Sequence, residues 1–302
     1  MSLEDTLLGQ KPMFDDFVAR GQRPLSCYHF VSVFAWKDFF DFEFVQLDGC
    51  LCVYAHQPEG SFLYLPPLGG DLSMATVEAC FKRMGARALS RIENISDKQL
   101  PLFQGRGYNI QRKADEYVYR KSDVVGLRGN AYKSQRHDYN YCDKKYAPCI
   151  RPYEDEDYQG CVDLFGRWAK ERMGRHQDQV YQAMLNDNAQ VHAVVIRHHR
   201  PLGLVGRVAV IDGQIVAYSF GYALDEKTFC ILFEVADLNY RGIAAYIFNR
   251  FCADEALGDF QWINTMDDFG MPQVAWTKKA LHPAKVIASF TVARNREGHE
   301  NF

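Results

Sequence analysis

Two Asp-Gly pairs, each set between apolar runs, constrain the fold of this chain more than any other feature. Asp48-Gly49 lies within FEFVQLDGCLCVYA, and Asp212-Gly213 lies within RVAVIDGQIVAYSFGYAL. An Asp-Gly pair favours a tight two-residue turn, because glycine adopts the positive φ angle that such a turn needs. Each half of the chain is therefore predicted to contain an antiparallel hairpin, and the two halves share a coarse pattern although their residues differ.

Helical segments alternate with these strands. Residues 73–84 and 158–172 carry apolar side chains at spacings of three and four after a polar or acidic start. The acidic run 154–157 precedes the second helix, where negative charge favours a helix N-terminus. We interpret that run as a capping face rather than a metal site. The segment AVVIR, residues 193–197, is predicted as a strand surrounded by His192, His198 and His199, which have no carboxylate partner at metal-ligand spacing.

The composition favours a protein of two domains. The chain has 302 residues, of which 47% are hydrophobic and 24% are charged, and this length suits two domains better than one. The formal charge of −3 gives no general attraction to nucleic acid or anionic lipid. No apolar run approaches the roughly 20 residues that span a bilayer, and the N-terminus MSLEDTLLGQK lacks a signal segment. We therefore expect a cytoplasmic protein without an integral membrane segment.

The cysteines do not fit a disulfide framework or a paired zinc site, because their number is odd and they are widely scattered. We predict reduced and mostly buried thiols. The nine cysteines are Cys27, Cys50, Cys52, Cys80, Cys142, Cys149, Cys161, Cys230 and Cys252. The sequence also lacks HExxH, GxSxG, Walker-loop and CxxC patterns, so a hydrolase, a zinc enzyme or a nucleoside triphosphatase is poorly supported, and no metal site is expected.

Four separated motifs carry a family resemblance. The C-terminal run INTMDDFGMPQVAWTKKALHP keeps Asn264, Asp268, Gly270, Lys278 and His282-Pro283 in a fixed order. Upstream motifs are FVSVFAWKDFF (30–40), LYLPPLGG (63–70) and LRGNAYKSQR (127–136). In this order they resemble an uncharacterised family related to the C-terminal domain of phosphatidylglycerol lysyltransferase. The resemblance covers most of the chain.

That resemblance implies an α/β (α+β) fold of two GNAT-like acyltransferase domains in tandem, similar to the Fem-type aminoacyltransferases. Each domain would have a mixed central sheet flanked by helices, and we place the domains at residues 1–140 and 141–302. For the motif residues Asn264, Asp268 and Lys278, our hypothesis is that they orient the acceptor of a transferase reaction. On spacing alone, Asp268 would instead cap a helix starting near Pro272, and the lysines would form a solvated face.

A candidate donor loop lies in the second half. Residues 228–235 read as a buried strand, 236–241 as a loop and 242–255 as a helix with an apolar stripe. Such a helix start exposes backbone N–H groups that receive a pyrophosphate, which is how the GNAT superfamily holds coenzyme A. The loop residues are Asn239, Tyr240, Arg241, Gly242, Ile243 and Ala244. Two departures from the superfamily pattern, at Asn239 and Ala244, weaken the case for coenzyme A, so the donor is either acyl-CoA or aminoacyl-tRNA, and no covalent cofactor is expected.

Glu234 stands in the otherwise apolar strand just before this loop. Desolvation at such a position raises the pKa of a carboxyl and suits it to deprotonate an attacking amine. In the alternative interpretation, Glu234 faces a water-filled cleft or pairs with Arg241 and has no catalytic function.

The region 106–151 is the most basic part of the chain. It has eleven Lys and Arg residues against five Asp and Glu residues, a local charge of +6. Tyr132, Tyr139, Tyr141 and Tyr146 are interleaved with them. Basic and aromatic side chains together can bind RNA, and the alternative is a solvated helix between the domains. Since Lys133 and Arg136 belong to a family motif, we keep them, with Tyr132, as candidates that bind substrate or RNA.

The sequence thus predicts an acyl or aminoacyl transferase in which an amine attacks an activated carbonyl, with Glu234, Asn264, Asp268 and Lys278 as the catalytic candidates. The acceptor would bear an amine. The alternative is a non-catalytic GNAT-fold module that binds RNA or an acidic partner through the basic region.

Overall fold

The computed structural model describes residues 3–175 and 179–295. The described chain forms two compact units. Unit 1 consists of residues 3–116, 267–275 and 286–295, and unit 2 consists of residues 117–266 and 276–285. Residue 140, where the sequence predicted the junction, lies inside a helix of unit 2.

Unit 1 is a mixed sheet with helices. Its helices are α1 (Leu3–Leu8), α2 (Lys11–Ala19), α3 (Phe30–Phe34), α4 (Met74–Met84) and the 3-10 helix η1 (Asp97–Leu102). Its strands are β1 (Asp41–Leu47), β2 (Cys50–Gln57), β3 (Gly60–Leu63), β4 (Arg91–Ser96), β11 (Lys285–Arg294) and the first part of β5 (Tyr108–Arg120). They lie in the order β1-β2-β3-β4-β11-β5.

The first Asp-Gly hairpin forms as predicted. Leu47 of β1 pairs with Cys50 of β2 around Asp48 and Gly49, which have φ angles of 50° and 78°. Helix α4 begins after Ser73, whose side chain accepts a hydrogen bond from the Thr76 amide. The apolar face of α4 packs on β2, β3 and β4 to form the core of the unit.

Unit 2 is also a mixed sheet with helices. Its helices are α5 (Lys121–Gly126), α6 (Lys133–Tyr146), α7 (Tyr158–Arg175), α8 (Gln179–Arg197), α9 (Ile243–Cys252), and the 3-10 helices η2 (Asp155–Asp157) and η3 (Glu255–Leu257). The strands are β6 (Cys149–Pro152), β7 (Val205–Ile211), β8 (Gln214–Ala223), β9 (Thr228–Ala236), β10 (Trp262–Asp267) and the last part of β5. Helix α10 (Pro272–Lys279) has residues in both units.

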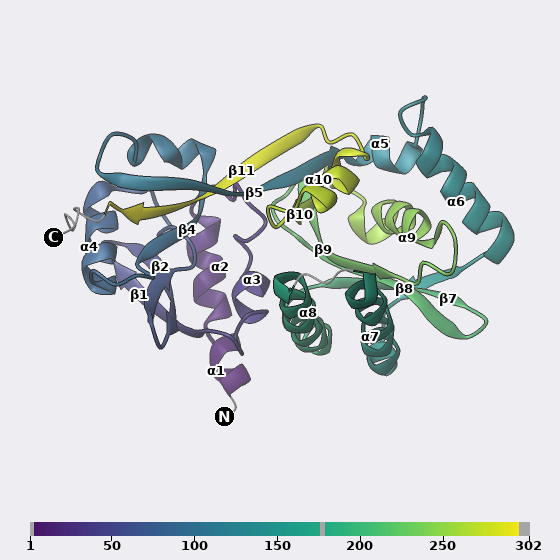
Figure 1. The fold of residues 1–302 in the computed structure, drawn as a ribbon, viewed down its shortest axis with the longest axis horizontal. Helices are drawn as coiled ribbons and strands as arrows, with labels where there is room; N and C mark the ends of the chain where they lie inside the picture. Colours follow the sequence, from purple (N-terminus) through teal and green to yellow (C-terminus); the bar gives the residue numbers. More distant parts are fainter. Residues whose placement is uncertain (1–2, 176–178, 296–302) are drawn as a thin grey trace. The chain divides into compact units, whose positions relative to one another are not determined.

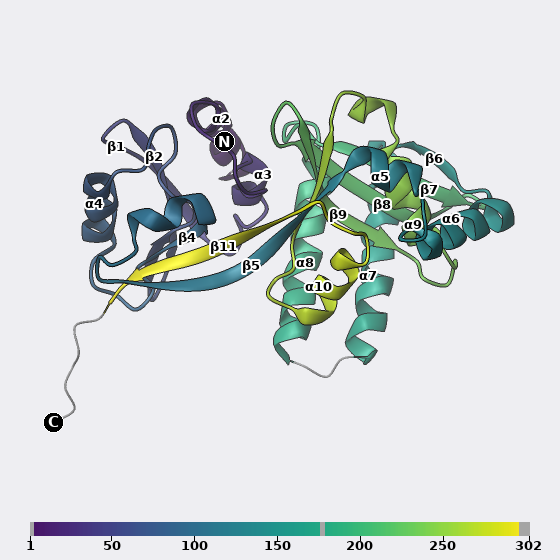
Figure 2. The same cartoon turned by 90° about the horizontal axis from the view of Figure 1, so that it is seen from above.

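The sheet of unit 2 has the order β5-β10-β9-β8-β7-β6 and is covered on both faces. Figure 1 shows α7 and α8 below the sheet and α9 on its other side, and Figure 2 shows α7 and α8 side by side. The second Asp-Gly hairpin also forms, with Ile211 of β7 paired to Gln214 of β8. On the α9 face, Ile243 and Ile247 pack against Ala217 and Ala236 of the sheet.

The two units repeat one arrangement. In each, a hairpin (β1-β2 or β7-β8) is followed by an antiparallel third strand (β3 or β9), then by a helix (α4 or α9) and a strand parallel to the third (β4 or β10). Two parallel neighbouring strands need such a crossover helix, because the end of the first strand and the start of the second lie at opposite ends of the strands. The similarity of the two halves inferred from the Asp-Gly pairs therefore extends to strand order.

Two local predictions were wrong. Residues 193–197 are not a strand but the last turns of α8, where Val191, Val195 and Ile196 are buried at helical spacing. A short run of β-branched residues cannot be assigned from its composition, and here the length of the surrounding helical pattern decides. The basic region is not a single helix, since it is divided among β5, α5, α6 and β6.

The nine cysteines are free thiols, and all except Cys27 and Cys149 are buried. Within residues 3–175 and 179–295, no helix combines the length and the hydropathy that crossing a membrane requires. Among the same residues, no three His, Cys, Asp or Glu side chains are placed to hold a metal ion.

Candidate functional site

The pairing of β9 and β10 ends part-way along both strands. Trp262 pairs with Thr228 and Asn264 pairs with Cys230, and this is the last matched pair. Strand β9 then continues to Ala236 and β10 to Asp267. In the same stretch β9 has a bulge. Phe220 of β8 pairs with Phe233 and Gly221 pairs with Ile231, which leaves Leu232 as the extra residue of β9. Bulges concentrate beside active sites, where they redirect side chains.

Glu234 lies in this unpaired end of β9. The residue as a whole is half-buried, but its Oε2 is inaccessible to solvent and has no hydrogen-bond partner among the described residues. Burial raises the pKa of the Glu234 carboxyl to about 8. The carboxylate also raises the pKa of the Cys252 thiol on α9, an effect second only to burial of that thiol. Glu234 is thus a buried carboxyl that lies near α9 and remains mostly protonated at neutral pH.

The candidate donor loop joins β9 to α9. The amides of Asn239 and Tyr240 donate to the side chain and carbonyl of Asp237, and the Ile243 amide donates to the Tyr240 carbonyl. These three amides are already hydrogen-bonded, so a ligand would use other N–H groups, such as that of Ala244 in the first turn of α9. Gly242 begins the helix with a φ of 85°.

Asn264 and Lys278 both bind backbone groups at the end of β10. The Met266 amide donates to Asn264 Oδ1 at 2.6 Å, and Lys278 Nζ donates to the carbonyls of Thr265 and, at 3.1 Å, Met266. Met266 has a φ of 62°, which is uncommon for a residue other than glycine and indicates stored strain. Both predicted site residues therefore hold a strained turn directly after the last β9–β10 pair.

Asp268 belongs to unit 1, whereas Glu234, Asn264 and Lys278 belong to unit 2. Its Oδ1 accepts hydrogen bonds from the amides of Asp115, at 3.2 Å, and Gly270, at 3.0 Å. The Asp268 amide donates in turn to the Asp115 carbonyl. These contacts fix the start of the C-terminal motif to β5.

The candidates at the start of α6 make structural contacts. The buried Tyr132 hydroxyl donates to the Leu281 carbonyl at 3.3 Å, and its ring meets His282 edge-on. Arg136 donates to the carbonyls of Leu127 and Gly129. Two family motifs, residues 127–136 and the His282-Pro283 end of the C-terminal run, thus pack against each other. Lys133 is exposed.

A basic and aromatic surface lies beside the candidate donor loop. The Arg241 guanidinium stands 4.9 Å from the centre of the Tyr141 ring on α6 and 3.3 Å from His137 Nε2. Lys145 Nζ donates to the Tyr141 hydroxyl at 3.0 Å and lies 5.2 Å from the Tyr146 ring centre. We call Arg241, Tyr141, Lys145 and Tyr146 the α6 surface. The predicted basic region therefore contributes cations and rings next to the loop.

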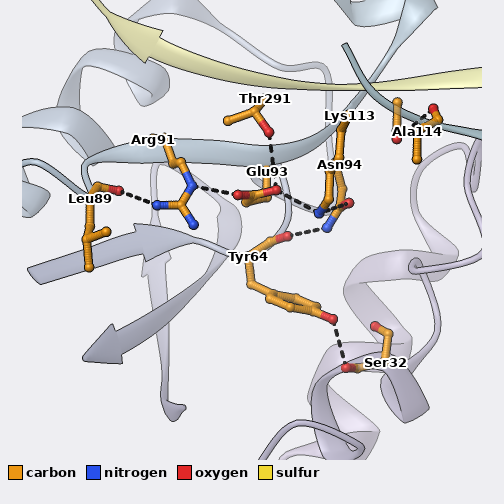
Figure 3. Close-up of polar contacts among 10 residues, drawn as sticks. Ser32, Tyr64, Leu89, Arg91, Glu93, Asn94, Lys113, Ala114 and Thr291 are labelled. Atoms are coloured by element: carbon orange, nitrogen blue, oxygen red, sulfur yellow. Dashed lines mark hydrogen bonds and ion pairs between the residues drawn. The ribbon is translucent and has the colours of Figure 1, made fainter. Parts of the chain in front are cut away.

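The corresponding position in unit 1 is bridged by side chains. The only matched pair of β3 and β4 is Leu63 with Ile92. Beyond it, Asn94 adopts a φ of 59° and donates from Nδ2 to the Tyr64 carbonyl at 2.8 Å. Lys113 then binds both Asn94 Oδ1, at 3.0 Å, and Glu93, at 2.7 Å. Figure 3 shows this network, whose contacts tie the diverging strands together.

Unit 1 has a cavity of about 570 Å³ whose lining includes none of the predicted site residues. Its lining is rich in phenylalanine, with Phe39, Phe40, Phe42 and Phe44. Lys37, the one cation of its lining, is paired with Glu4 and Asp38.

The family model of the phosphatidylglycerol lysyltransferase C-terminal domain matches residues 20–289. The chain belongs to this family. Its membership confirms the resemblance carried by the four motifs and relates the chain to aminoacyl and acyl transferases. No curated protein matches the sequence.

Solved structures confirm the fold. A conserved protein of unknown function from Bacteroides thetaiotaomicron VPI-5482 is 20% identical with a TM-score of 0.82, over 95% of this chain and 97% of that one. FemX is 7% identical with a TM-score of 0.60, over 93% and 95%. A tandem GNAT protein from the clavulanic acid biosynthesis pathway is 12% identical with a TM-score of 0.51, over 98% and 97%. The chain therefore has the predicted tandem GNAT-like fold.

Two residues of the site were missed. Thr265 and Tyr119 lie next to Lys278: the Tyr119 hydroxyl donates to the Lys278 carbonyl at 2.8 Å, and Thr265 supplies a carbonyl to Lys278 Nζ. Thr265 lies inside the INTMDD motif. Its position at the end of a strand that carries other polar residues could have indicated it as a site residue. Tyr119 gave no signal, because its position depends on β5 lying beside β10.

Proposed function

We propose that the protein transfers an activated acyl or aminoacyl group to an amine at the unpaired ends of β9 and β10 in unit 2. The observation that carries this proposal is the unpartnered, buried Oε2 of Glu234. Leaving a buried carboxyl oxygen unsatisfied costs free energy, and such atoms concentrate where a ligand completes the hydrogen bonds. A carboxyl with a pKa near 8 is suited to take a proton from an amine at slightly basic pH.

In this reaction the amine nitrogen attacks the acyl carbon, and the bond to the leaving oxygen or sulfur breaks. Glu234 takes the amine proton and returns one to the leaving group, so that an amide and a free alcohol or thiol result. Asn264 and Lys278 hold the backbone at the end of β10, and through it they position the acyl group. Since a thioester or an aminoacyl ester is already reactive, positioning supplies much of the rate.

The α6 surface favours aminoacyl-tRNA over acyl-CoA as the donor. Arg241 and Lys145 are exposed cations set against the rings of Tyr141 and Tyr146. Cations bind phosphates and rings stack on bases, which is the combination that single-stranded RNA requires. The tRNA donor also agrees with the lysyltransferase named by the family and with FemX.

Thermal unfolding of the purified protein tests the donor. A ligand that binds only the folded state raises the melting temperature by mass action. We expect lysyl-tRNA to raise it more than uncharged tRNA does, and acetyl-CoA to leave it unchanged. A rise with acetyl-CoA alone would assign a coenzyme A donor, and the absence of any response to all three would remove the transferase proposal.

The α6 surface also supports a second candidate function, a non-catalytic module that binds RNA. In that case charged and uncharged tRNA would stabilise the protein equally, and no aminoacyl transfer to any amine would follow.

A further inference from the structure

Besides Glu234 Oε2, two buried side-chain oxygens of unit 2 lack a hydrogen-bond partner among the described residues. They are Gln135 Oε1 and Thr265 Oγ1. Gln135 lies on α6 and uses its amide nitrogen to bind the Ala280 carbonyl at 2.7 Å. Thr265 instead lies on β10, one residue beyond the last β9–β10 pair. Its hydroxyl therefore stands at the same strand divergence as Glu234.

Thr265 and Glu234 also point to the same face of the sheet. Phe229 packs against Phe251 of α9, with ring centres 5.7 Å apart, and it pairs with Ile263. Because side chains alternate along a strand, Thr265 shares the face of Ile263. On β9, Phe233 stacks on His192 of α8 at 3.9 Å, so the next residue, Glu234, points to the α9 face.

The neighbour of Thr265 among the described residues, Tyr119, does not form a hydrogen bond with the Thr265 hydroxyl that meets the geometric criteria. Tyr119 lies on the α9 face, since its ring meets Phe248 of α9 at 6.5 Å, and its hydroxyl proton is donated to the Lys278 carbonyl. Burial raises the pKa of Tyr119, and the Thr265 hydroxyl, which is close enough to donate toward the Tyr119 oxygen, opposes that rise. Even so, the Thr265 hydroxyl has no acceptor in hydrogen-bonding geometry within the described part of the chain.

A buried hydroxyl without an acceptor and a buried carboxyl oxygen without a donor, both beyond the last β9–β10 pair, match the reacting groups of an aminolysis. The acyl carbonyl oxygen accepts a hydrogen bond and gains negative charge as the amine attacks. The amine carries the proton that a carboxylate accepts. We infer that the Thr265 hydroxyl donates to the acyl carbonyl oxygen of the donor while Glu234 takes the amine proton. This inference rests on the proposed function and adds Thr265 as a catalytic residue.

The geometry of the turn supports this assignment. Lys278 Nζ binds the Thr265 and Met266 carbonyls, and Asn264 Oδ1 binds the Met266 amide. The peptide group that follows Thr265 is thus held at both its carbonyl and its amide, which restricts the direction of the Thr265 side chain. Preorganised donors of this kind stabilise a developing oxyanion without reorganisation during the reaction.

The test compares acylated with non-acylated ligands. The first pair of probes is lysyl-tRNA with a stable amide link to the 3′ end and uncharged tRNA, and the second pair is acetyl-CoA and CoA. The affinity of each probe is measured for the wild type, T265V and T265S. The wild type should prefer one acylated probe over its partner. In T265V the ratio of the affinities for the acylated and the non-acylated probe should fall roughly three- to tenfold, as expected for the loss of one neutral hydrogen bond. The affinity for the non-acylated probe should stay unchanged. T265S should retain it.

Folding does not limit this test, because valine has nearly the shape of threonine and removes a buried hydroxyl without a partner, so T265V should melt at or above the wild-type temperature. If T265V keeps the full preference, the inference about Thr265 is overturned while the proposed function stands. If the wild type prefers neither acylated probe, the proposed function fails, and the inference fails with it.

Discussion

Gly242 and Asp138 are in close contact, and the carbonyl oxygen of Asp138 on α6 occupies the space that a Cβ at Gly242 would need. Gly242 begins α9 with a φ of 85°. The contact holds the N-terminus of α9 directly against α6. The candidate donor loop and the α6 surface are therefore fixed relative to each other by a residue that has no side chain.

Gly242→Ala should destabilise unit 2 strongly, because the added methyl overlaps backbone atoms and the φ is unfavourable for alanine. We expect a loss of more than about 2 kcal/mol in the free energy of unfolding by urea. Gly213→Ala is the matched control, since Gly213 has a φ of 76° but open space around it. It should lose only about 1–2 kcal/mol. Equal losses would show that the contact with Asp138 contributes nothing.

The Glu234 carboxyl should make stability depend on pH. Its pKa is about 8 in the folded protein, against about 4.3 in an unfolded chain. Between these values the folded protein keeps a proton that the unfolded chain has released, so the free energy of unfolding falls as the pH rises from about 4.3 to about 8. Above that range the contribution is constant.

Glu234→Gln should remove this fall, and the variant should become more stable relative to the wild type as the pH rises. Urea unfolding at pH 5, 7 and 9 measures the difference. Glu226→Gln is the control, because Glu226 is exposed and its substitution should change stability equally at all three values. Parallel pH profiles for the wild type and Glu234→Gln would mean that the carboxyl is ionised in the folded protein.

Sequence patterns predicted the local architecture well, because it depends on nearby residues. Both hairpins follow from Asp48-Gly49 and Asp212-Gly213, and the burial of Glu234 was visible as a charge within an apolar strand. Residues 193–197 were misassigned, since a run of four β-branched or small residues, 193–196, fits a strand as well as a buried helix.

The detail of the site could not be predicted in the same way. Arg241 and Tyr141 are 100 positions apart in the chain and meet only because α6 packs against α9. Lys278 binds two backbone carbonyls at the end of β10, and no spacing rule indicates a contact between a side chain and the backbone 12 or 13 residues away. Such contacts require the tertiary structure.

Lys278→Met should loosen the turn at the end of β10. It removes a charged donor from the carbonyls of Thr265 and Met266, and a hydrogen bond from a charged group contributes about 1.5–3 kcal/mol. We expect a loss of that size, with faster hydrogen exchange in residues 264–268. Lys279→Met is the control, because the Lys279 side chain is exposed and its loss should change stability by less than about 0.5 kcal/mol. Unchanged exchange in Lys278→Met would exclude Lys278 as a positioning residue.

The α6 surface should make tRNA binding depend on salt. Each cation that contacts a phosphate releases a counterion, so the logarithm of the affinity falls linearly with the logarithm of the salt concentration. Arg241→Ala and Lys145→Ala should each weaken binding and reduce the slope by about 0.7–0.9. Tyr141→Ala should weaken binding without changing the slope, because it removes a stacking ring and no charge. The exposed Lys98 of η1 is the control, and its substitution by alanine should leave both values unchanged. If Arg241→Ala and Lys98→Ala have the same tRNA affinity and the same salt dependence, tRNA does not bind at the α6 surface. The structure of unit 2 would then no longer favour aminoacyl-tRNA over acyl-CoA as the donor.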